Sequence, residues 1–334
     1  MKTVEQYRIF EYTMPGTRAE GTFRQEGTVQ TVSGYACGDG KIAVRFMPET
    51  TGRWEYRIVF DGGETVGSIL CTPAAPENHG PVRAKGMHME YADGTRFLSF
   101  GTTCYGWIHQ PDELRRQTLR SLAASPFNKI RMLLFPKFMP YNNTEPVMFP
   151  FQKNEAGEWD VSKPNYAFWD DLDTQLLALD ELGIEADLIL FHPYDRWGFD
   201  AMSREENLTY LRYCVSRLGA YKNIWWSLAN EYDMTPNKTE ADWDAFGELV
   251  SKLDGGRHLL SIHNCCQVYP DRDWMTHCSI QSSLCRRTLT WGWQYRKPVF
   301  IDECGYEGNI EFSWGNLSAF EMVHRFWTTV ACGG

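Results

Sequence analysis

From residue 82 onward, the sequence alternates between short apolar runs and longer segments with helical periodicity. Strand, helix and strand in series indicate a parallel sheet with right-handed crossovers. Eight runs qualify as strands, and eight is the number of strands in a (β/α)8 barrel. The sequence therefore predicts an α/β fold, a TIM barrel. The eight runs are residues 99–103, 129–134, 186–191, 224–229, 258–262, 278–281, 298–301 and 327–331.

Helix start signals separate several of these runs. Ser203 and Glu206 form the capping-box pattern ahead of an apolar stripe, and Ser318 and Glu321 repeat it. Only residues 332–334 follow the eighth run, which leaves no room for the eighth helix that normally seals a barrel. We therefore expect a chain cut short after strand eight, with an exposed seam that is covered by further sequence or by a second copy in a homo-oligomer.

Residues 1–71 have a different pattern, in which short β-rich segments are separated by glycine turns. This pattern predicts a small antiparallel Ig-like β-sandwich without a catalytic constellation, which would act as an accessory domain. Residues 72–81 are polar and rich in proline, as expected of a linker. Residues 82–334 then form the predicted catalytic barrel, which begins with a hairpin over residues 82–91.

Two glutamates follow apolar runs that we identify as strands. Glu231 ends the fourth run and is preceded by Asn230, and Glu303 follows the seventh run. In a barrel the carboxyl ends of all strands meet at one mouth, so these two carboxyl groups can face each other. Hydrolysis of a glycosidic bond with retention requires such a pair, one protonated as acid and one ionised as nucleophile. The alternative is that both are ordinary strand-terminal acids that cap the following helices.

Asp302 competes with Glu303 for the second position of the pair. Because side chains alternate along a strand, Glu303 shares a face with Ile301 while Asp302 lies on the other face. Only one of the two acids can therefore point into the mouth. We favour Glu303, because an aspartate side chain is one methylene shorter.

Six strings in the chain form a characteristic combination: GRWEY at residues 52–56, GTTCYGW at 101–107, FNKIR at 127–131, NE at 230–231, DECGYEG at 302–308 and WGNL at 314–317. With them the chain resembles bacterial glycoside hydrolases of the (β/α)8 clan that includes the cellulase and mannanase families. The resemblance is greatest to the apiosidase-like branch, which carries an N-terminal β-sandwich module of uncharacterised function. It spans nearly the whole chain and implies a retaining glycosidase that acts on plant-type oligo- or polysaccharides.

The resemblance implies roles for four residues. Glu231 would be the acid/base and Glu303 the nucleophile, which is where the family motif places its acid. Asn230 would hold a substrate hydroxyl, and a hydrogen bond to the sugar 2-hydroxyl strengthens as the transition state develops. Arg131 would be a cation near the nucleophile, and a guanidinium lowers the pKa of a carboxyl that must stay ionised. For Arg131, a structural ion pair low in the barrel is the alternative.

Six further side chains are predicted to bind substrate at the mouth. The aromatic ones offer faces on which sugar rings stack, and the histidines either touch the sugar or orient the two acids. For each, core packing or a satisfied structural role is the alternative. The sixth run ends at Gln281 without the aromatic residue often found there in the wider clan, which leaves the hydrogen-bond partner of the nucleophile open. The six are Tyr105, Trp107, His192, Tyr194, His263 and Trp314.

Composition argues against several other classes of protein. The formal net charge of −10 disfavours a nucleic-acid partner, because phosphate binding draws on Lys and Arg. No stretch approaches eighteen apolar residues and the N-terminus lacks an apolar signal core, so we expect a cytoplasmic protein without membrane contact. The ten cysteines lack a disulfide framework and a CxxC pair, and we expect free thiols.

Two other functional classes stay open. A metal-dependent sugar isomerase or hydrolase on the same barrel would recruit acids and histidines from three loops, although they lack HxH or HExxH spacing. A non-catalytic carbohydrate-binding protein is the third class, but loss of one acid would indicate it and both are present. The retaining glycosidase, with an oligosaccharide as its partner, needs no metal or other cofactor. The ligands for the metal-dependent alternative are His192, Asp195, Glu231, Asp233 and His263.

Overall fold

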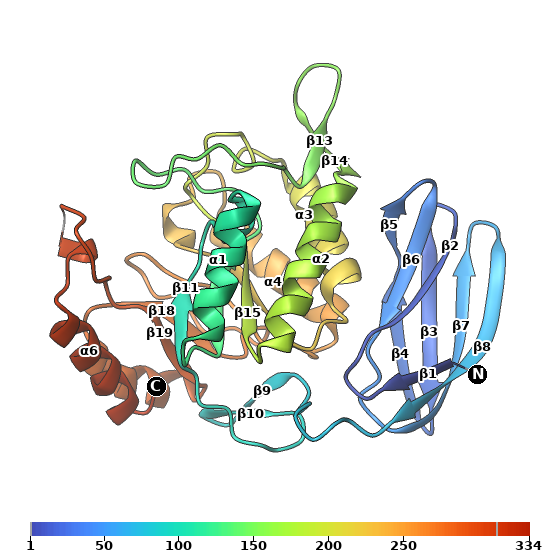
Figure 1. Ribbon diagram of the computed structural model, residues 1–334, viewed down its shortest axis with the longest axis horizontal. Coiled ribbons are helices and arrows are strands. Elements are labelled where there is room, and N and C mark those ends of the chain that lie inside the picture. Colours follow the sequence, from blue (N-terminus) through green and yellow to red (C-terminus); the bar gives the residue numbers. More distant parts are fainter. Residues whose placement is uncertain (1, 312) are drawn as a thin grey trace.

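The computed structural model describes residues 2–311 and 313–334, and its N-terminal part consists of two β-sheets (Figure 1). The first sheet has the order β1 (Lys2–Glu5), β8 (Gly63–Thr72), β7 (Gly52–Phe60), β3 (Ala19–Gln25) and β4 (Thr28–Ser33). The second has the order β2 (Phe10–Pro15), β6 (Lys41–Phe46) and β5 (Tyr35–Gly38). Neighbouring strands are antiparallel except that β1 pairs with β8 in parallel.

The two sheets pack face to face over a shared core, because apolar side chains alternate with polar ones along their strands. In β7, Trp54 and Ile58 are buried whereas the residues on either side of each are exposed. The rings of Phe23 and Phe46 stack between the sheets with their centroids 4.0 Å apart. This close packing requires glycine at position 21, because a Cβ atom on Gly21 would lie 2.9 Å from the Phe23 ring.

The connection between the two parts of the chain is packed against both. In residues 73–81, the side-chain amide of Asn78 donates to Glu5 at 2.7 Å and to the backbone oxygen of Gln6 at 3.0 Å. The predicted hairpin follows as β9 (Val82–Lys85) and β10 (His88–Tyr91). Its Met89 is buried with Trp225, near the amino end of a later strand, so the hairpin covers that end of the sheet.

The larger, C-terminal part contains seven parallel strands. In order they are β11 (Gly101–Thr103), β12 (Lys129–Leu133), β15 (Glu185–Phe191), β16 (Ile224–Ala229), β17 (Leu260–Ser261), β18 (Cys278–Gln281) and β19 (Val299–Glu303). The first five form one sheet and the last two another, and a bridge between His263 and Ser279 links the two. Each strand overlaps one of the first seven predicted runs. Between β19 and β11, the described residues show no strand pairing, so the closed barrel that we expected is not established.

Helices alternate with these strands, as the sequence predicts. They are α1 (Asp112–Ala123), α2 (Tyr166–Glu181), α3 (Arg204–Leu218), α4 (Glu240–Asp254), α5 (Thr288–Tyr295) and α6 (Ala319–Ala331). A hairpin of β13 (Phe151–Lys153) and β14 (Trp159–Pro164) interrupts the connection before α2, and short 3-10 turns lie at Trp107–His109, Tyr232–Met234, Cys285–Arg287 and Ser313–Gly315. The capping box predicted for Ser203 and Glu206 begins α3. Within the described residues, no helix combines the length and apolar character that crossing a bilayer requires.

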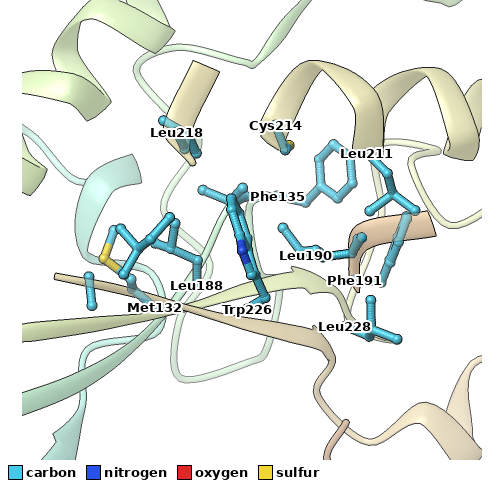
Figure 2. Close-up of a cluster of buried hydrophobic side chains, with 14 of the residues drawn as sticks. Met132, Phe135, Leu188, Leu190, Phe191, Leu211, Cys214, Leu218, Trp226 and Leu228 are labelled. Carbon is cyan, nitrogen blue, oxygen red and sulfur yellow. The ribbon is translucent and has the colours of Figure 1, made fainter. Parts of the chain in front are cut away.

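One face of the sheet is apolar and packs against the helices. The opposite face, which we call the interior, carries several polar and charged side chains. Met132, Leu188 and Trp226 come from three neighbouring strands and belong to one buried cluster with Leu211 and Leu218 of α3 (Figure 2). Because side chains alternate along a strand, the intervening residues face the interior. Four of these interior residues are polar or charged, Lys129, Arg131, Asp187 and Ser227, and Leu133 and Ile189 on the same strands are apolar.

The prediction of an eighth strand at residues 327–331 is wrong, because these residues form the end of α6. The hydroxyl of Ser318 accepts the backbone N–H of Glu321 at 3.2 Å, so the predicted start signal does begin a helix. Glu321 also accepts from Arg325 one turn later, at 2.7 Å. A short apolar run does not by itself distinguish strand from helix, and here the helical spacing extends through the run. The apolar residues at this spacing are Phe320, Val323, Trp327 and Val330.

The N-terminal sheets contact α2 and α3 through a buried cluster of charges, and Figure 1 shows them on that side of the molecule. Arg45 of β6 donates to Asp173 of α2 at 2.8 Å and to the backbone oxygen of Arg217 at 3.0 Å. Arg217 itself donates to Asp173 at 2.8 Å, and Glu11 accepts from Arg45 at 2.6 Å. The guanidinium of Arg45 therefore joins the two parts of the chain.

Replacing Arg45 with methionine is expected to lower the free energy of unfolding by about 3 kcal/mol, because it leaves the buried Asp173 carboxylate without this partner. Urea denaturation followed by tryptophan fluorescence measures the change. Arg57→Met is the matched control, since the Arg57–Glu64 pair lies on the same sheets but is more than half exposed. Equal unfolding free energies for the two variants would show that Arg45 does not couple the two parts.

Candidate active site

A cluster of ion pairs fills the sheet interior below the carboxyl ends of the strands. Lys129 Nζ lies 2.6 Å from Asp302 Oδ1 and 3.1 Å from Asp187 Oδ2. Arg131 Nε lies 3.3 Å from the same Asp187 oxygen, and the Ser279 hydroxyl donates to Asp302 at 2.5 Å. Burial opposes ionisation of Asp302, but Lys129 and Arg131 outweigh it and hold the pKa of that carboxyl below its ordinary value. The ionised Asp302 carboxylate is therefore a member of this ion-pair cluster.

Glu303 lies above the cluster, at the end of β19. Ile280 pairs with Ile301 and Gln281 with Glu303, so Asp302 is an extra residue that shifts the register between the two strands. Such a bulge redirects the next side chain. This explains how two consecutive acids can both point to the same side of the strand, Asp302 into the ion-pair cluster and Glu303 towards Tyr105. The simple alternation that we used to choose between Asp302 and Glu303 does not hold at this point.

The carboxyl of Glu303 is 5% exposed and accepts a hydrogen bond from the Tyr105 hydroxyl. Tyr306, three residues further along the chain, donates to the Tyr105 oxygen at 3.3 Å. Burial raises the pKa of Glu303, although Arg131 and the hydrogen bond from Tyr105 act in the opposite direction. Arg131 acts to lower this pKa, but burial has the larger effect, and Arg131 also forms the structural ion pair with Asp187 that we gave as its alternative role. Glu231 contributes a further increase.

Glu231 follows β16 in a left-handed conformation, with φ 49° and ψ 55°. A non-glycine residue in this region is strained by on the order of 1 kcal/mol, and such strain is common at functional sites. The backbone on either side is fixed, because Asn230 donates to the Phe191 oxygen at 2.9 Å and Tyr232 donates to the His263 oxygen at 3.0 Å. The strained turn directs the Glu231 carboxyl to the Tyr194 hydroxyl, which donates to it.

Asn230 connects the surroundings of the two carboxyl groups. Its amide nitrogen donates to the Tyr194 oxygen at 3.3 Å, and its amide oxygen lies 3.5 Å from the Tyr105 oxygen. A chain of contacts therefore runs from Glu303 through Tyr105, Asn230 and Tyr194 to Glu231. These residues come from the ends of four different strands, where a barrel-type fold carries its reactive groups. Two carboxyl groups held in this way can supply an acid and a nucleophile to one bond.

Two predicted mouth residues lie in the interior of the protein. Trp107 is buried in the main core, and its indole N–H donates to the Arg115 backbone oxygen at 3.2 Å. His263 is fully buried among the ion pairs, where burial and Arg131 hold the pKa of its ring well below the ordinary value. Neither ring is placed to stack on or bind a sugar at the mouth. Trp107 thus matches the alternative of core packing, whereas His263 is buried with no hydrogen-bond partner for either ring nitrogen among the described residues.

His192 and Trp314 accept hydrogen bonds from the backbone N–H groups of two tyrosines of the site. One ring nitrogen of His192 lies 3.1 Å from the Phe135 oxygen, and the other accepts the Tyr194 N–H at 3.1 Å. Burial lowers the pKa of His192 to about 4, so the neutral ring has one donor and one acceptor, as these contacts require. The backbone oxygen of Trp314 accepts from the N–H of Tyr306 at 2.6 Å. These contacts position Tyr194 and Tyr306.

Sequence reasoning missed two residues of the site, Lys137 and Tyr306. Tyr306 belongs to the DECGYEG string, and its place three residues after Glu303 was an available signal. With Tyr105 it occupies the position near Glu303 that Gln281 left open. Lys137 lies in the long connection after β12, and nothing in the local pattern distinguishes it. Its ammonium lies 4.7 Å from the Tyr105 ring centroid and 4.3 Å from that of Tyr194.

Four of the five side chains proposed as metal ligands, all except His263, have other hydrogen-bond partners. Asp233 accepts the backbone N–H groups of Cys265, Cys266 and Gln267 at 2.6–2.8 Å. In the part of the chain that the structure describes, no three His, Cys, Asp or Glu side chains lie close enough together to hold an ion. The metal-dependent alternative thus gains no support from this geometry.

The parallel strands and the helices between them define an α/β protein, and its similarity to known proteins gives the class, a protein of the glycoside hydrolase type. The chain belongs to the apiosidase-like family, since residues 83–334 match the family model for its catalytic domain. Residues 3–61 match a domain family of unknown function, DUF5060. A comparison with curated proteins gave no match.

Solved structures agree with this assignment. A candidate glycoside hydrolase from Bacteroides vulgatus ATCC 8482 is 37% identical, with a TM-score of 0.94 over 98% of this chain and 70% of its own. A family 5 glycoside hydrolase from the same organism is 15% identical, with a TM-score of 0.58 over 78% of this chain and 61% of its own. An endo-1,4-β-mannanase from Rhizomucor miehei is 13% identical, with a TM-score of 0.52 over 69% of this chain and 83% of its own. The last two show similarity of fold alone.

Proposed function

We propose that the protein hydrolyses O-glycosidic bonds of plant-type oligo- or polysaccharides with retention, using Glu231 as acid/base and Glu303 as nucleophile. The observation that carries this proposal is the chain of contacts that joins the two carboxyl groups through Tyr105, Asn230 and Tyr194. Residues 82–334 would be the catalytic domain, residues 1–71 an accessory domain and residues 72–81 their linker.

In the first step, a carboxylate oxygen of Glu303 attacks the anomeric carbon while Glu231 gives its proton to the departing glycosidic oxygen. The bond to the leaving group breaks as a covalent glycosyl ester forms on Glu303. In the second step, Glu231 takes a proton from water, and the resulting attack on the anomeric carbon releases Glu303. Burial disfavours the ionised form of Glu303, and the Tyr105 hydrogen bond and Arg131 offset part of that cost.

Asn230 would bind the substrate beside the attacked carbon. One of its two amide hydrogens is used by the Tyr194 oxygen, which leaves the second for a sugar hydroxyl. A hydrogen bond to the 2-hydroxyl strengthens as positive charge develops on the ring. Tyr194 and Tyr105 then fix both the amide and the two acids in one arrangement.

The stereochemistry of the product tests this mechanism. Retention needs carboxyl groups about 5–5.5 Å apart, whereas inversion needs a wider gap that admits water. A screen of aryl glycosides and plant-polysaccharide oligomers identifies a substrate, and proton NMR then reads the anomer that is released first. We expect the first product to keep the configuration of the substrate. A first product of inverted configuration would exclude Glu303 as a nucleophile.

A further inference from the structure

Lys137 is held in a defined position above the carboxyl ends of the strands. The next residue, Phe138, donates its backbone N–H to the backbone oxygen of Tyr194 at 2.8 Å, which ties the connection after β12 to the loop after β15. Met139 and Asn142 then exchange two backbone hydrogen bonds, at 3.0 and 2.8 Å. The half-buried side chain of Lys137 consequently projects from an anchored segment.

The ammonium of Lys137 lies against the two tyrosines that bind the two carboxyl groups. Tyr105 donates to Glu303 and Tyr194 donates to Glu231, and Lys137 Nζ lies within 4.7 Å of both ring centroids. At these distances a cation is attracted to the face of an aromatic ring. One ammonium thereby contacts both halves of the site. No other lysine in the described residues has cation–π contacts with either of these tyrosines.

The acids whose charges act on Lys137 are Glu303 and Glu231. Its Nζ makes no hydrogen bond or ion pair with another residue that the structure describes. Burial lowers the pKa of Lys137, whereas Glu303 and Glu231 raise it, so the ammonium and the carboxylates stabilise each other. Arg131, the other cation near Glu303, is already paired with Asp187. The rings that contact Lys137 are those of Tyr105, Tyr141 and Tyr194, and the titratable groups that interact with its charge are His192, Glu231 and Glu303.

We infer that Lys137 is a positioning residue of the proposed reaction, which fixes Tyr105 and Tyr194 through their rings and supplies the positive charge that the pair of carboxylates shares. This inference rests on the proposed glycosidase function. Its electrostatic part concerns the resting protein and can be measured without a substrate.

Replacing Lys137 with methionine keeps much of the side-chain volume and removes the charge. We expect kcat/KM to fall about tenfold. The acidic limb of the pH profile of kcat/KM should shift to higher pH by about half a unit, because a carboxylate that loses a nearby cation has a higher pKa. Lys137→Arg should restore the wild-type limb, because it keeps the charge and stacks on aromatic rings. Lys153→Met is the matched control, since this exposed lysine lies 4.7 Å from the Trp159 ring centroid, on the β13–β14 hairpin.

A second measurement separates this inference from the proposed function. Carbon-13 NMR of glutamate-labelled protein follows the titration of Glu303 in the wild type and in Lys137→Met. A higher apparent pKa of Glu303 in the variant supports the inference, whether or not the wild type hydrolyses a glycoside. Absence of glycoside hydrolysis by the wild type would refute the proposed function alone. Lys137→Gln repeats both measurements if the methionine variant does not fold. Two results would overturn the inference. One is that neither the NMR titration nor the acidic limb of the pH profile changes in the variant. The other is that activity falls at all pH values while the acidic limb stays at the same pH.

Discussion

Glu303→Gln is expected to lower kcat/KM on the order of 10⁴-fold, because an amide does not attack the anomeric carbon and no glycosyl ester can form. The substitution keeps the size of the side chain and its contact with the Tyr105 hydroxyl. Initial rates on an activated aryl glycoside measure the effect. Glu307→Gln is the control, since this exposed glutamate lies on the same loop and has no place in the proposed mechanism.

The stability of Glu303→Gln distinguishes a catalytic role from a structural one. Burial raises the pKa of Glu303 in the folded protein, so its ionised form costs stability once the pH exceeds the pKa of the unfolded chain. Removing that charge should leave the melting temperature at pH 7 equal to or above that of the wild type. Lost activity together with a lower melting temperature would instead indicate that Glu303 maintains the fold. Activity close to the wild type would eliminate it as the nucleophile.

Glu231→Ala is expected to lose most activity on substrates with poor leaving groups, by about 10²–10⁴-fold, because nothing protonates the departing oxygen. An activated aryl glycoside needs little protonation, so it should still form the glycosyl ester on Glu303. Hydrolysis of that ester then becomes slow without a base. Azide, which needs no base, should restore turnover and release a glycosyl azide of retained configuration.

The comparison of azide rescue in two variants tests the division of roles. Azide should not restore retained product in Glu303→Gln, since that variant forms no ester to be attacked. Product release is followed by absorbance, and the anomer of the azide by proton NMR. The assignment of Glu231 as acid/base is untenable if both variants respond equally or if neither responds.

Local sequence patterns determined the strands and two of the helix starts. Seven apolar runs became parallel strands, and Ser203 with Glu206 formed the predicted capping box, because burial and capping depend on residues close together in the chain. The same patterns put Asn230, Glu231 and Glu303 at strand ends. The prediction of a strand for the eighth run was wrong for a related reason. Its apolar residues suit a strand, but the preceding cap at Ser318 and the recurrence of apolar residues every three or four positions make it part of a helix.

Only the tertiary structure decided what each side chain near the strand ends contacts. Tyr105 and Trp107 are only two residues apart, yet Trp107 packs in the core whereas Tyr105 donates a hydrogen bond to Glu303. Glu303 lies on a strand almost two hundred residues further along the chain. Lys137 acquired its place because the loop after β12 is bonded to the loop after β15. The sequence by itself thus determined that acids follow the fourth and seventh strands, because the extent of a strand is a local property, whereas the bulge at Asp302 that redirects Glu303 appeared only in the structure. The partners that hold those acids depend on the packing of loops distant in the chain, which no local pattern encodes.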